Sequence, residues 1–143
     1  MKSVLLYANV DPGLEARLQA ALDVTRLFDG HLTCVQVTPQ DAFIIGDPFG
    51  GVFALPTVVA QVQRVAEEQR ERVQARLADE DVGWSWRRFD GAPAQVIVDR
   101  ARLADLIVLS LPGEEGGGAQ ALVADVLVHA RAPVLAVPSE ERS

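Results

Sequence analysis

The sequence predicts a single α/β domain in which an open parallel sheet of five strands is covered by helices on both faces. Its 143 residues are a usual length for one such domain. Strand-like apolar runs alternate with helical patterns along the chain, in the order βαβαβαβαβ. The stretch 105–111 is almost continuously apolar, which is typical of a strand buried on both faces of a parallel sheet.

The amino-acid composition is that of a folded globular domain and argues against several other classes of protein. Apolar residues make up 49% of the chain and charged residues 23%, as in a folded globular domain. A net charge of −7, with Lys2 as the only lysine, argues against a nucleic-acid surface, which needs a dense basic face. Cys34 is the only cysteine, so no internal disulfide can form, and its thiol suits the core of a cytoplasmic protein. No stretch has the length of a transmembrane helix or the pattern of a signal peptide, so we expect no membrane contact.

The first strand is predicted at 3–8 and the second at 31–37, with a helix between them. Asp11 is the predicted N-cap of this helix, and Pro12 is its expected first residue. Gly30 is expected to end the helix in the usual C-terminal position. The predicted inner face of the helix contains Leu14, Leu18, Ala21, Leu22 and Thr25.

The connection at 40–55 differs from the rest of the chain. It mixes glycine and proline with apolar and aromatic side chains between Phe43 and Phe53. Such a segment forms a lid or a protein-partner contact, or it packs over the sheet edge, and the sequence leaves these alternatives open. A long helix is predicted at 57–78. Its expected inner face contains Val58, Val62, Val65, Ala66, Gln69 and Val73.

The second half of the chain completes the sheet. Residues 84–89 alternate in polarity and predict an edge strand, on which Trp84 and Trp86 share a face that is covered by a helix or by a partner. A helix follows Pro93, a further helix is predicted at 119–130, and the last strand is predicted at 133–138. The inner faces of these helices are expected to contain Val96, Ile97, Ala101 and Leu103, and Leu122, Val123, Val126, Leu127 and Ala130. We expect one domain at 1–138 and a polar tail at 139–143.

The glycine-rich turn at 112–118 is the candidate ligand site. Ligands of open α/β sheets lie beyond the carboxyl ends of the strands, where the strand order reverses. A glycine-rich turn before a helix lets backbone N–H groups approach an anion closely. The turn lacks the Gly-Lys-Ser/Thr ending of a Walker A motif, and it follows the fourth strand rather than the first, unlike a Rossmann fingerprint.

Other chemistries find little support. Ser110 lies at a strand end but outside a Gly-x-Ser-x-Gly elbow, which argues against a hydrolase nucleophile. His31 and His129 are far apart in sequence and lack neighbours at metal-ligand spacing. His129 is expected near a helix C-terminus, where a structural role matches the helix dipole. No catalytic residue and no metal ligand is therefore predicted.

Four segments carry a resemblance to the universal stress protein family along nearly the whole chain. They are the opening KSVLL at 2–6, FDGAP at 89–93, ADLIV at 104–108 and VLVHARAPVLAV at 126–137. The resemblance implies a five-stranded parallel sheet in the order 3-2-1-4-5. It also implies a homodimer, which in this family often pairs the last strands across a two-fold axis. Some members bind ATP and others do not.

The ATP-binding motif of the family is only partly present. It resembles Gly-x-x-Gly, nine residues, then Gly-Ser or Gly-Thr; Ser110 stands at the first glycine and Gly113 at the second, and the final pair falls on Gln120 and Ala121. The loop is therefore three residues short, since six residues rather than nine separate Gly113 from the pair. A family aspartate aligns with Asn9, with Asp11 as a shifted substitute. The candidate site comprises Ala8, Asn9, Asp11, Val37, Ser110, Pro112, Gly113, Gly116, Gly117, Gly118, Gln120 and Ala121.

These departures argue against tight ATP binding. The pair at Gln120 and Ala121 supplies no hydroxyl, and Glu114 and Glu115 place negative charge near any triphosphate. The expected function is that of a cytoplasmic, dimeric stress-response module that is not an enzyme, with 40–55 as a surface for a protein partner. The alternative is a nucleotide sensor for ATP or AMP, with Mg²⁺ as bridging cation. The candidate dimer interface comprises Pro133, Val134, Leu135, Ala136 and Val137.

Overall fold

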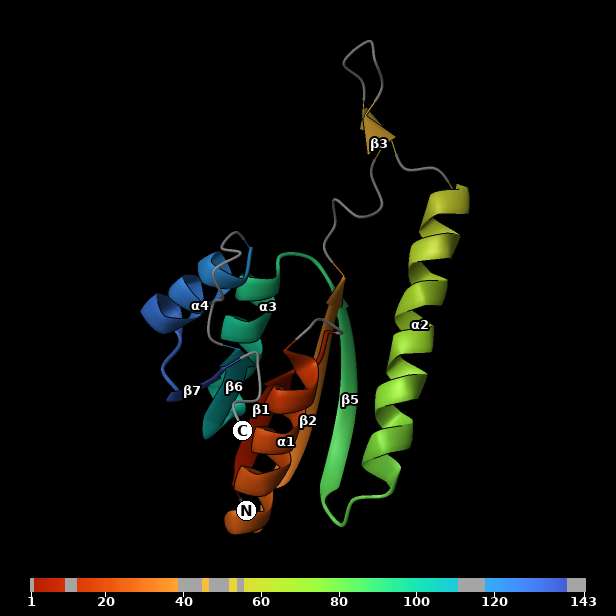
Figure 1. Ribbon diagram of the computed structural model, residues 1–143. Coiled ribbons are helices and arrows are strands. Elements are labelled where there is room, and N and C mark those ends of the chain that lie inside the picture. The colour runs from red at the N-terminus through yellow and green to blue at the C-terminus, as the bar shows by residue number, and fades with distance from the viewer. Residues whose placement is uncertain are drawn as a thin grey trace.

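A computed structural model describes residues 2–9, 13–38, 45–46, 52–53, 56–110 and 118–138, and the side chains of the last range from 122 onward. One five-stranded parallel sheet forms the centre of the molecule, with the strands in the order β5-β2-β1-β6-β7 (Figure 1). This is the predicted order 3-2-1-4-5, so the predicted fold class is confirmed. The strands are β1 (Ser3–Tyr7), β2 (His31–Thr38), β5 (Gly83–Asp90), β6 (Leu106–Ser110) and β7 (Val134–Val137).

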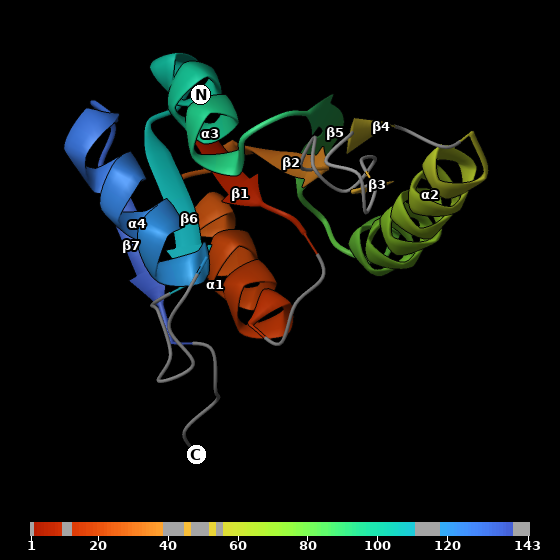
Figure 2. The same cartoon turned by 90° about the horizontal axis from the view of Figure 1, so that it is seen from above.

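Helices cover the two faces of the sheet in three layers. Figure 2 shows α1 (Leu14–Leu27) and α2 (Pro56–Ala78) on one side, and α3 (Pro93–Arg100) and α4 (Gly118–His129) on the other. A short 3-10 turn, η2 (Ala101–Leu103), follows α3. Alternate residues of each strand enter two separate apolar cores, because successive side chains of a strand point to opposite faces. Cys34 lies in the core beneath α1 and α2, where burial raises the pKa of its thiol to about 12.

The connection at 40–55 is described only at two short strands. β3 (Ile45–Gly46) and β4 (Val52–Phe53) pair antiparallel, apart from the main sheet. The predicted choice between a lid, a partner contact and packing over the sheet edge lies outside the described residues.

The ends of α1 differ from the prediction. The helix begins at Leu14, with Gly13 in the N-cap position, whereas the predicted N-cap Asp11 and first residue Pro12 lie outside the described residues. At the other end, the left-handed residue is Asp29, with φ of 49°, rather than Gly30. Gly30 is needed for a different reason: a Cβ there would lie 2.5 Å from the carbonyl oxygen of Lys2.

In α2, in α3 with η2, and in α4, the predicted inner face includes residues that are exposed in the structure. In α2 the buried residues are Ala66, Val73 and Leu77, whereas Val65 is 40% exposed. Figure 1 shows why: the N-terminal half of α2 reaches past the end of β5. Leu103 is 89% exposed and Leu127 60% exposed, although both were expected to face the core.

The two tryptophans follow the helix-covered alternative. Trp84 and Trp86 are half-buried on β5 and pack against the core beneath α1 and α2. None of the helices described in the structure combines the length and apolar character needed to cross a bilayer.

Candidate functional site

The predicted site residues that the structure describes gather at one edge of the sheet. Asn9 follows β1, Val37 lies near the end of β2, and Ser110 is the last residue of β6. β1 lies between β2 and β6, so the strand order reverses here and the carboxyl ends of the three strands meet. Ala8, which precedes Asn9, is buried at this edge. Its N–H donates to the carbonyl of Val35 at 2.8 Å.

Asn9 closes the gap between the ends of β1 and β2. Its side-chain Nδ2 donates to the Val37 carbonyl at 2.7 Å, and its Oδ1 accepts from the Val37 N–H at 2.8 Å. A single carboxamide thus pairs with both backbone groups of Val37, as a neighbouring strand residue would. Both backbone groups of Val37, a residue predicted to bind a ligand, are therefore already hydrogen-bonded to Asn9.

Arg17, on α1, occupies the space between the ends of β1 and β6. Its Nε donates to the carbonyl of Tyr7 at 2.7 Å, its Nη2 to the carbonyl of Asn9 at 2.8 Å, and its Nη1 to Ser110 Oγ at 2.7 Å. Its guanidinium also lies 5.4 Å from the centre of the Tyr7 ring. The side chain is 1% exposed, so a cation is buried at the centre of the candidate site.

This arrangement offers recognition rather than bond-making chemistry. A guanidinium donates hydrogen bonds but does not take up a proton, so Arg17 is no general base for Ser110. Among the residues that the structure describes, no three His, Cys, Asp or Glu side chains converge as metal ligands would. What this edge of the sheet can do is hold polar or anionic groups in competition with its own hydrogen bonds.

Most of the predicted loop at 112–118 lies outside the described residues, which resume at Gly118. Asp11, Pro112, Gly113, Gly116 and Gly117 are outside the described residues. The structure begins α4 at Gly118, which places Gln120 and Ala121 in its first turn, with their side chains not described. Whether these residues bind a ligand stays a prediction.

Arg17 is the site residue that the sequence analysis missed. It stands three residues after Leu14 and four before Ala21, on the predicted inner face of α1. A charged residue within an apolar stripe is therefore the signal that could have identified it. The pair formed by Asn9 and Val37 has no comparable signal, because its partners are 28 residues apart in sequence.

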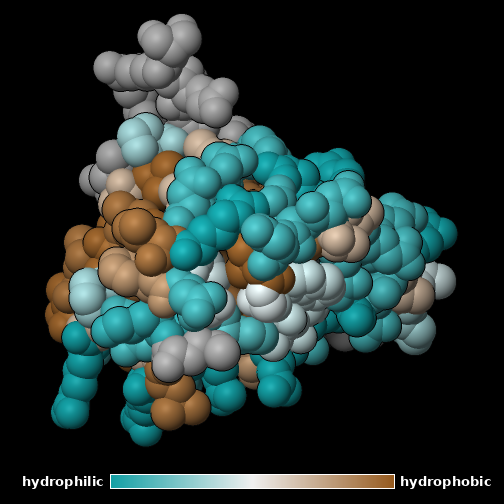
Figure 3. Space-filling model, turned by 90° about the horizontal axis from the view of Figure 1, so that it is seen from below, coloured by the Kyte–Doolittle hydropathy of each residue, from teal (hydrophilic) through white to brown (hydrophobic). Residues whose placement is uncertain are grey.

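The candidate dimer surface lies at the far edge of the sheet. β7 pairs with β6 on one side only, its four residues are half-buried, and Pro133 before it is exposed. On the neighbouring α4, Leu127 and Val128 are 60% and 76% exposed. Figure 3 shows hydrophobic side chains gathered on the side of the molecule that carries α4 and β7.

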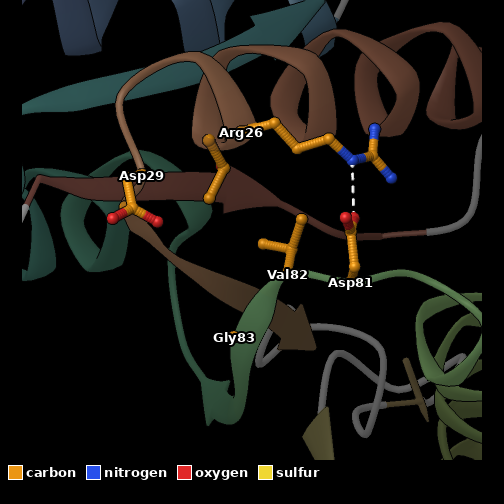
Figure 4. A pocket seen from close by; sticks show the side chains of 7 residues that line it. Arg26, Asp29, Asp81, Val82 and Gly83 are labelled. Carbon is orange, nitrogen blue, oxygen red and sulfur yellow. Dashed lines mark hydrogen bonds and ion pairs between the residues drawn. The ribbon is translucent and has the colours of Figure 1, made fainter.

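A small polar hollow of about 210 Å³ lies at the amino ends of β2 and β5, at the end of the sheet opposite to Asn9 and Ser110 (Figure 4). Its lining residues are Thr25, Arg26, Asp29, Gly30, Asp81, Val82 and Gly83. Arg26 Nε donates to Asp81 at 2.8 Å, and this guanidinium holds the pKa of the Asp81 carboxyl below its usual value. No residue predicted to bind a ligand lies in this hollow.

Comparison with proteins of known structure agrees with the observed strand order. No protein-family model and no curated protein matches the sequence. Solved universal stress proteins share the fold. One from Burkholderia pseudomallei has a TM-score of 0.72 at 20% identity, with 96% of each chain covered. UspA from Lactobacillus plantarum has a TM-score of 0.69 at 17% identity, covering 95% of this chain and 97% of that one. One from Archaeoglobus fulgidus, in complex with dAMP, has a TM-score of 0.66 at 19% identity, covering 96% and 97%.

Proposed function

We propose that this chain is a universal-stress-type regulatory module of the cytoplasm that acts as a homodimer, binds ATP weakly or not at all, and is not an enzyme. The shared fold and the four sequence segments support the family assignment. The domain at 1–138 would constitute this module, with the protein partner contacted through 40–55.

One observation carries the nucleotide part of the proposal. Asn9 hydrogen-bonds both backbone groups of Val37, and Arg17 hydrogen-bonds Tyr7, Asn9 and Ser110. A nucleotide at this edge must break these bonds before it can form its own, which leaves little net gain because each exchange replaces one hydrogen bond by another.

The dimer part of the proposal is supported by the exposed apolar residues of α4 beside an open strand edge. A parallel sheet with an unpaired apolar edge strand is prone to uncontrolled pairing unless another chain covers it. A second copy placed on Pro133, Val134, Leu135, Ala136 and Val137 would cover that edge.

A nucleotide sensor is the second candidate function. It is favoured by the Archaeoglobus fulgidus structure, whose complex with dAMP shows that this fold can hold an adenine nucleotide. In this chain the sensor would bind ATP or AMP through the loop after β6, with Mg²⁺ as bridging cation, and its dimer state or partner affinity would respond.

Calorimetric titration with ATP, ADP and AMP, with and without Mg²⁺, separates the two candidates. We expect no saturable heat at nucleotide concentrations up to about 1 mM, the level at which a binding free energy of roughly 4 kcal/mol would be detected. Asn9→Ala frees the Val37 backbone, and we expect AMP binding to become measurable in this variant.

The opposite outcome is equally specific. Micromolar binding by the unaltered protein, abolished by bulky substitutions at Gly113 or Gly117, would establish the sensor and contradict the proposal. Arg72→Met, at an exposed position of α2, is the matched control and should leave every titration unchanged.

A further inference from the structure

The layer between α2 and the sheet contains three buried polar atoms that have no hydrogen-bond partner among the described residues. They are Gln36 Oε1 on β2, Trp86 Nε1 on β5 and Arg70 Nε on α2. The Gln36 side chain is 3% exposed. Polar atoms buried in this way are normally hydrogen-bonded, and each one left unpaired costs about 1–3 kcal/mol.

The three atoms belong to neighbouring levels of the same layer. Gln36 Nε2 donates to the carbonyl of Ala66 at 3.0 Å, which places Ala66 over Gln36. Figure 1 shows α2 running antiparallel to β2 and β5, so Arg70, four residues further along the helix, lies about 6 Å lower. Trp86 pairs with Cys34, two residues before Gln36 and about 6.6 Å lower, and therefore lies at the level of Arg70.

The orientation of the Gln36 amide is fixed by its known partner. The carbonyl of Ala66 can only accept, so the NH₂ group of Gln36 must face it and Oε1 must face away. The layer therefore presents one acceptor, Gln36 Oε1, and two donors, Trp86 Nε1–H and Arg70 Nε–H.

This combination selects the chemistry of a ligand. A carboxylate only accepts hydrogen bonds, so it would set an unpaired oxygen against Gln36 Oε1. An ammonium group only donates, so it would oppose the N–H groups of Trp86 and Arg70. A hydroxyl oxygen accepts two hydrogen bonds and donates one, which matches all three atoms.

We propose that Gln36, Trp86 and Arg70 form a binding site for one hydroxyl oxygen, supplied by a small alcohol or by water. Two of its groups come from the sheet and one comes from α2, so the bound oxygen joins the helix to the sheet. The site contains neither Asn9 nor Arg17, and it does not depend on nucleotide binding.

Nuclear Overhauser effects from the Trp86 indole N–H test the site directly. The chain has two tryptophans, so Trp84→Phe assigns the Trp86 signal. In ¹⁵N-labelled protein with added ethylene glycol, a long-lived contact from this N–H to the methylene protons identifies an alcohol, and one to the water resonance alone identifies water. Gln36→Met and Arg70→Met should each abolish the contact, whereas Arg72→Met should keep it.

Absence of both contacts, or contacts that survive Gln36→Met and Arg70→Met, would overturn the proposal. If Gln36→Met fails to fold, the half-exposed Arg70 gives the decisive variant.

A double-mutant cycle provides a second readout. Gln36→Met and Trp86→Phe remove an acceptor and a donor that reach each other only through the shared oxygen. Their combined effect on the folding equilibrium constant should depart from additivity by about fivefold. Gln36→Met with Trp84→Phe is the control and should be additive, because Trp84 pairs with Leu32, well below Gln36. Additivity in both cycles would contradict a shared oxygen.

Discussion

Single residues in this protein act through close backbone approaches that only the folded chain reveals. Gly30 is the clearest case, because the carbonyl of Lys2 leaves no room for a side chain at its position. The N–H of the next residue, His31, donates to that same carbonyl at 2.8 Å, so the chain cannot shift away without losing a bond of the sheet. Gly30 therefore allows the amino ends of β1 and β2 to lie this close together.

We predict that Gly30→Ala lowers the free energy of unfolding by about 1–3 kcal/mol, as overpacking against a rigid backbone does. Gly83→Ala is the matched control. Its Cβ would meet only the His31 ring, with Nδ1 at 3.3 Å, and a ring held by one hydrogen bond to Ser85 shifts more easily than a backbone carbonyl. Urea unfolding curves for the two variants check the prediction, and equal midpoints for both would contradict it.

Individual residues also show which parts of the site the sequence could and could not predict. Asn9 and Ser110 were predicted as site residues from the resemblance to universal stress proteins, in which Asn9 aligns with a family aspartate and Ser110 with the first glycine of the ATP-binding motif. Arg17 was missed because a charged residue on a helix is usually read as exposed, and its partners lie on two strands and a loop. Gly30 was predicted to end the first helix, since its close approach to Lys2 leaves no trace in the sequence.

Among the elements, α2 is attached to the rest of the molecule mainly by its C-terminal half. Its buried residues begin at Ala66, ten positions after the helix starts at Pro56. Near its C-terminal end, Arg76 Nη1 lies 2.6 Å from Glu80 Oε1, and the same carboxylate forms an ion pair with Arg26 of α1. One acidic side chain after α2 thus links the ends of both helices on this face.

We predict that Glu80→Gln loosens the C-terminal half of α2. Hydrogen exchange of backbone amides at 70–78 should become faster, while exchange at 14–25 in α1 should not change. Exposed and half-exposed ion pairs contribute little singly, so the loss of stability should be about 1 kcal/mol or less and should shrink at high salt. Glu67→Gln is the control, since Glu67 pairs only with Arg70, at 3.5 Å, among the described residues. Unchanged exchange at 70–78 would contradict the prediction.

The presence of each strand and helix was easier to predict than which of its residues the rest of the molecule buries. All five strands of the sheet were expected near their observed bounds, because apolar runs of strand length alternate with helical patterns. The inner face of α2 was overestimated because periodicity identifies an apolar stripe but not how far the sheet extends beneath it. Val65 belongs to that stripe, yet it is 40% exposed.

At the scale of the whole molecule, two of the six large apolar residues that are exposed among the described residues are neighbours on α4, beside the edge strand β7. These residues are Leu127 and Val128, and Figure 3 shows hydrophobic side chains gathered on the side of the molecule that carries α4 and β7. A folded monomer rarely leaves such a surface uncovered, and the proposed homodimer would cover it.

We predict that Val128→Glu converts the dimer to a monomer, because a charge in an apolar interface must be desolvated without a partner. Leu27→Glu is a closely matched control, since Leu27 and Val128 are both 76% exposed but Leu27 lies at the end of α1. Sedimentation velocity at micromolar concentration distinguishes the outcomes. A monomer before any substitution would remove the dimer, and equal effects of both changes would place the interface elsewhere.

The single lysine of the chain has a practical consequence. Lys2 is exposed and precedes β1, at the amino edge of the sheet beside Gly30. Asn9 and Arg17 form their hydrogen bonds at the carboxyl edge of the same sheet. A sensor chip or dye coupled through the ε-amine of Lys2 would therefore tether each copy by its amino edge and leave the carboxyl edge facing the solution.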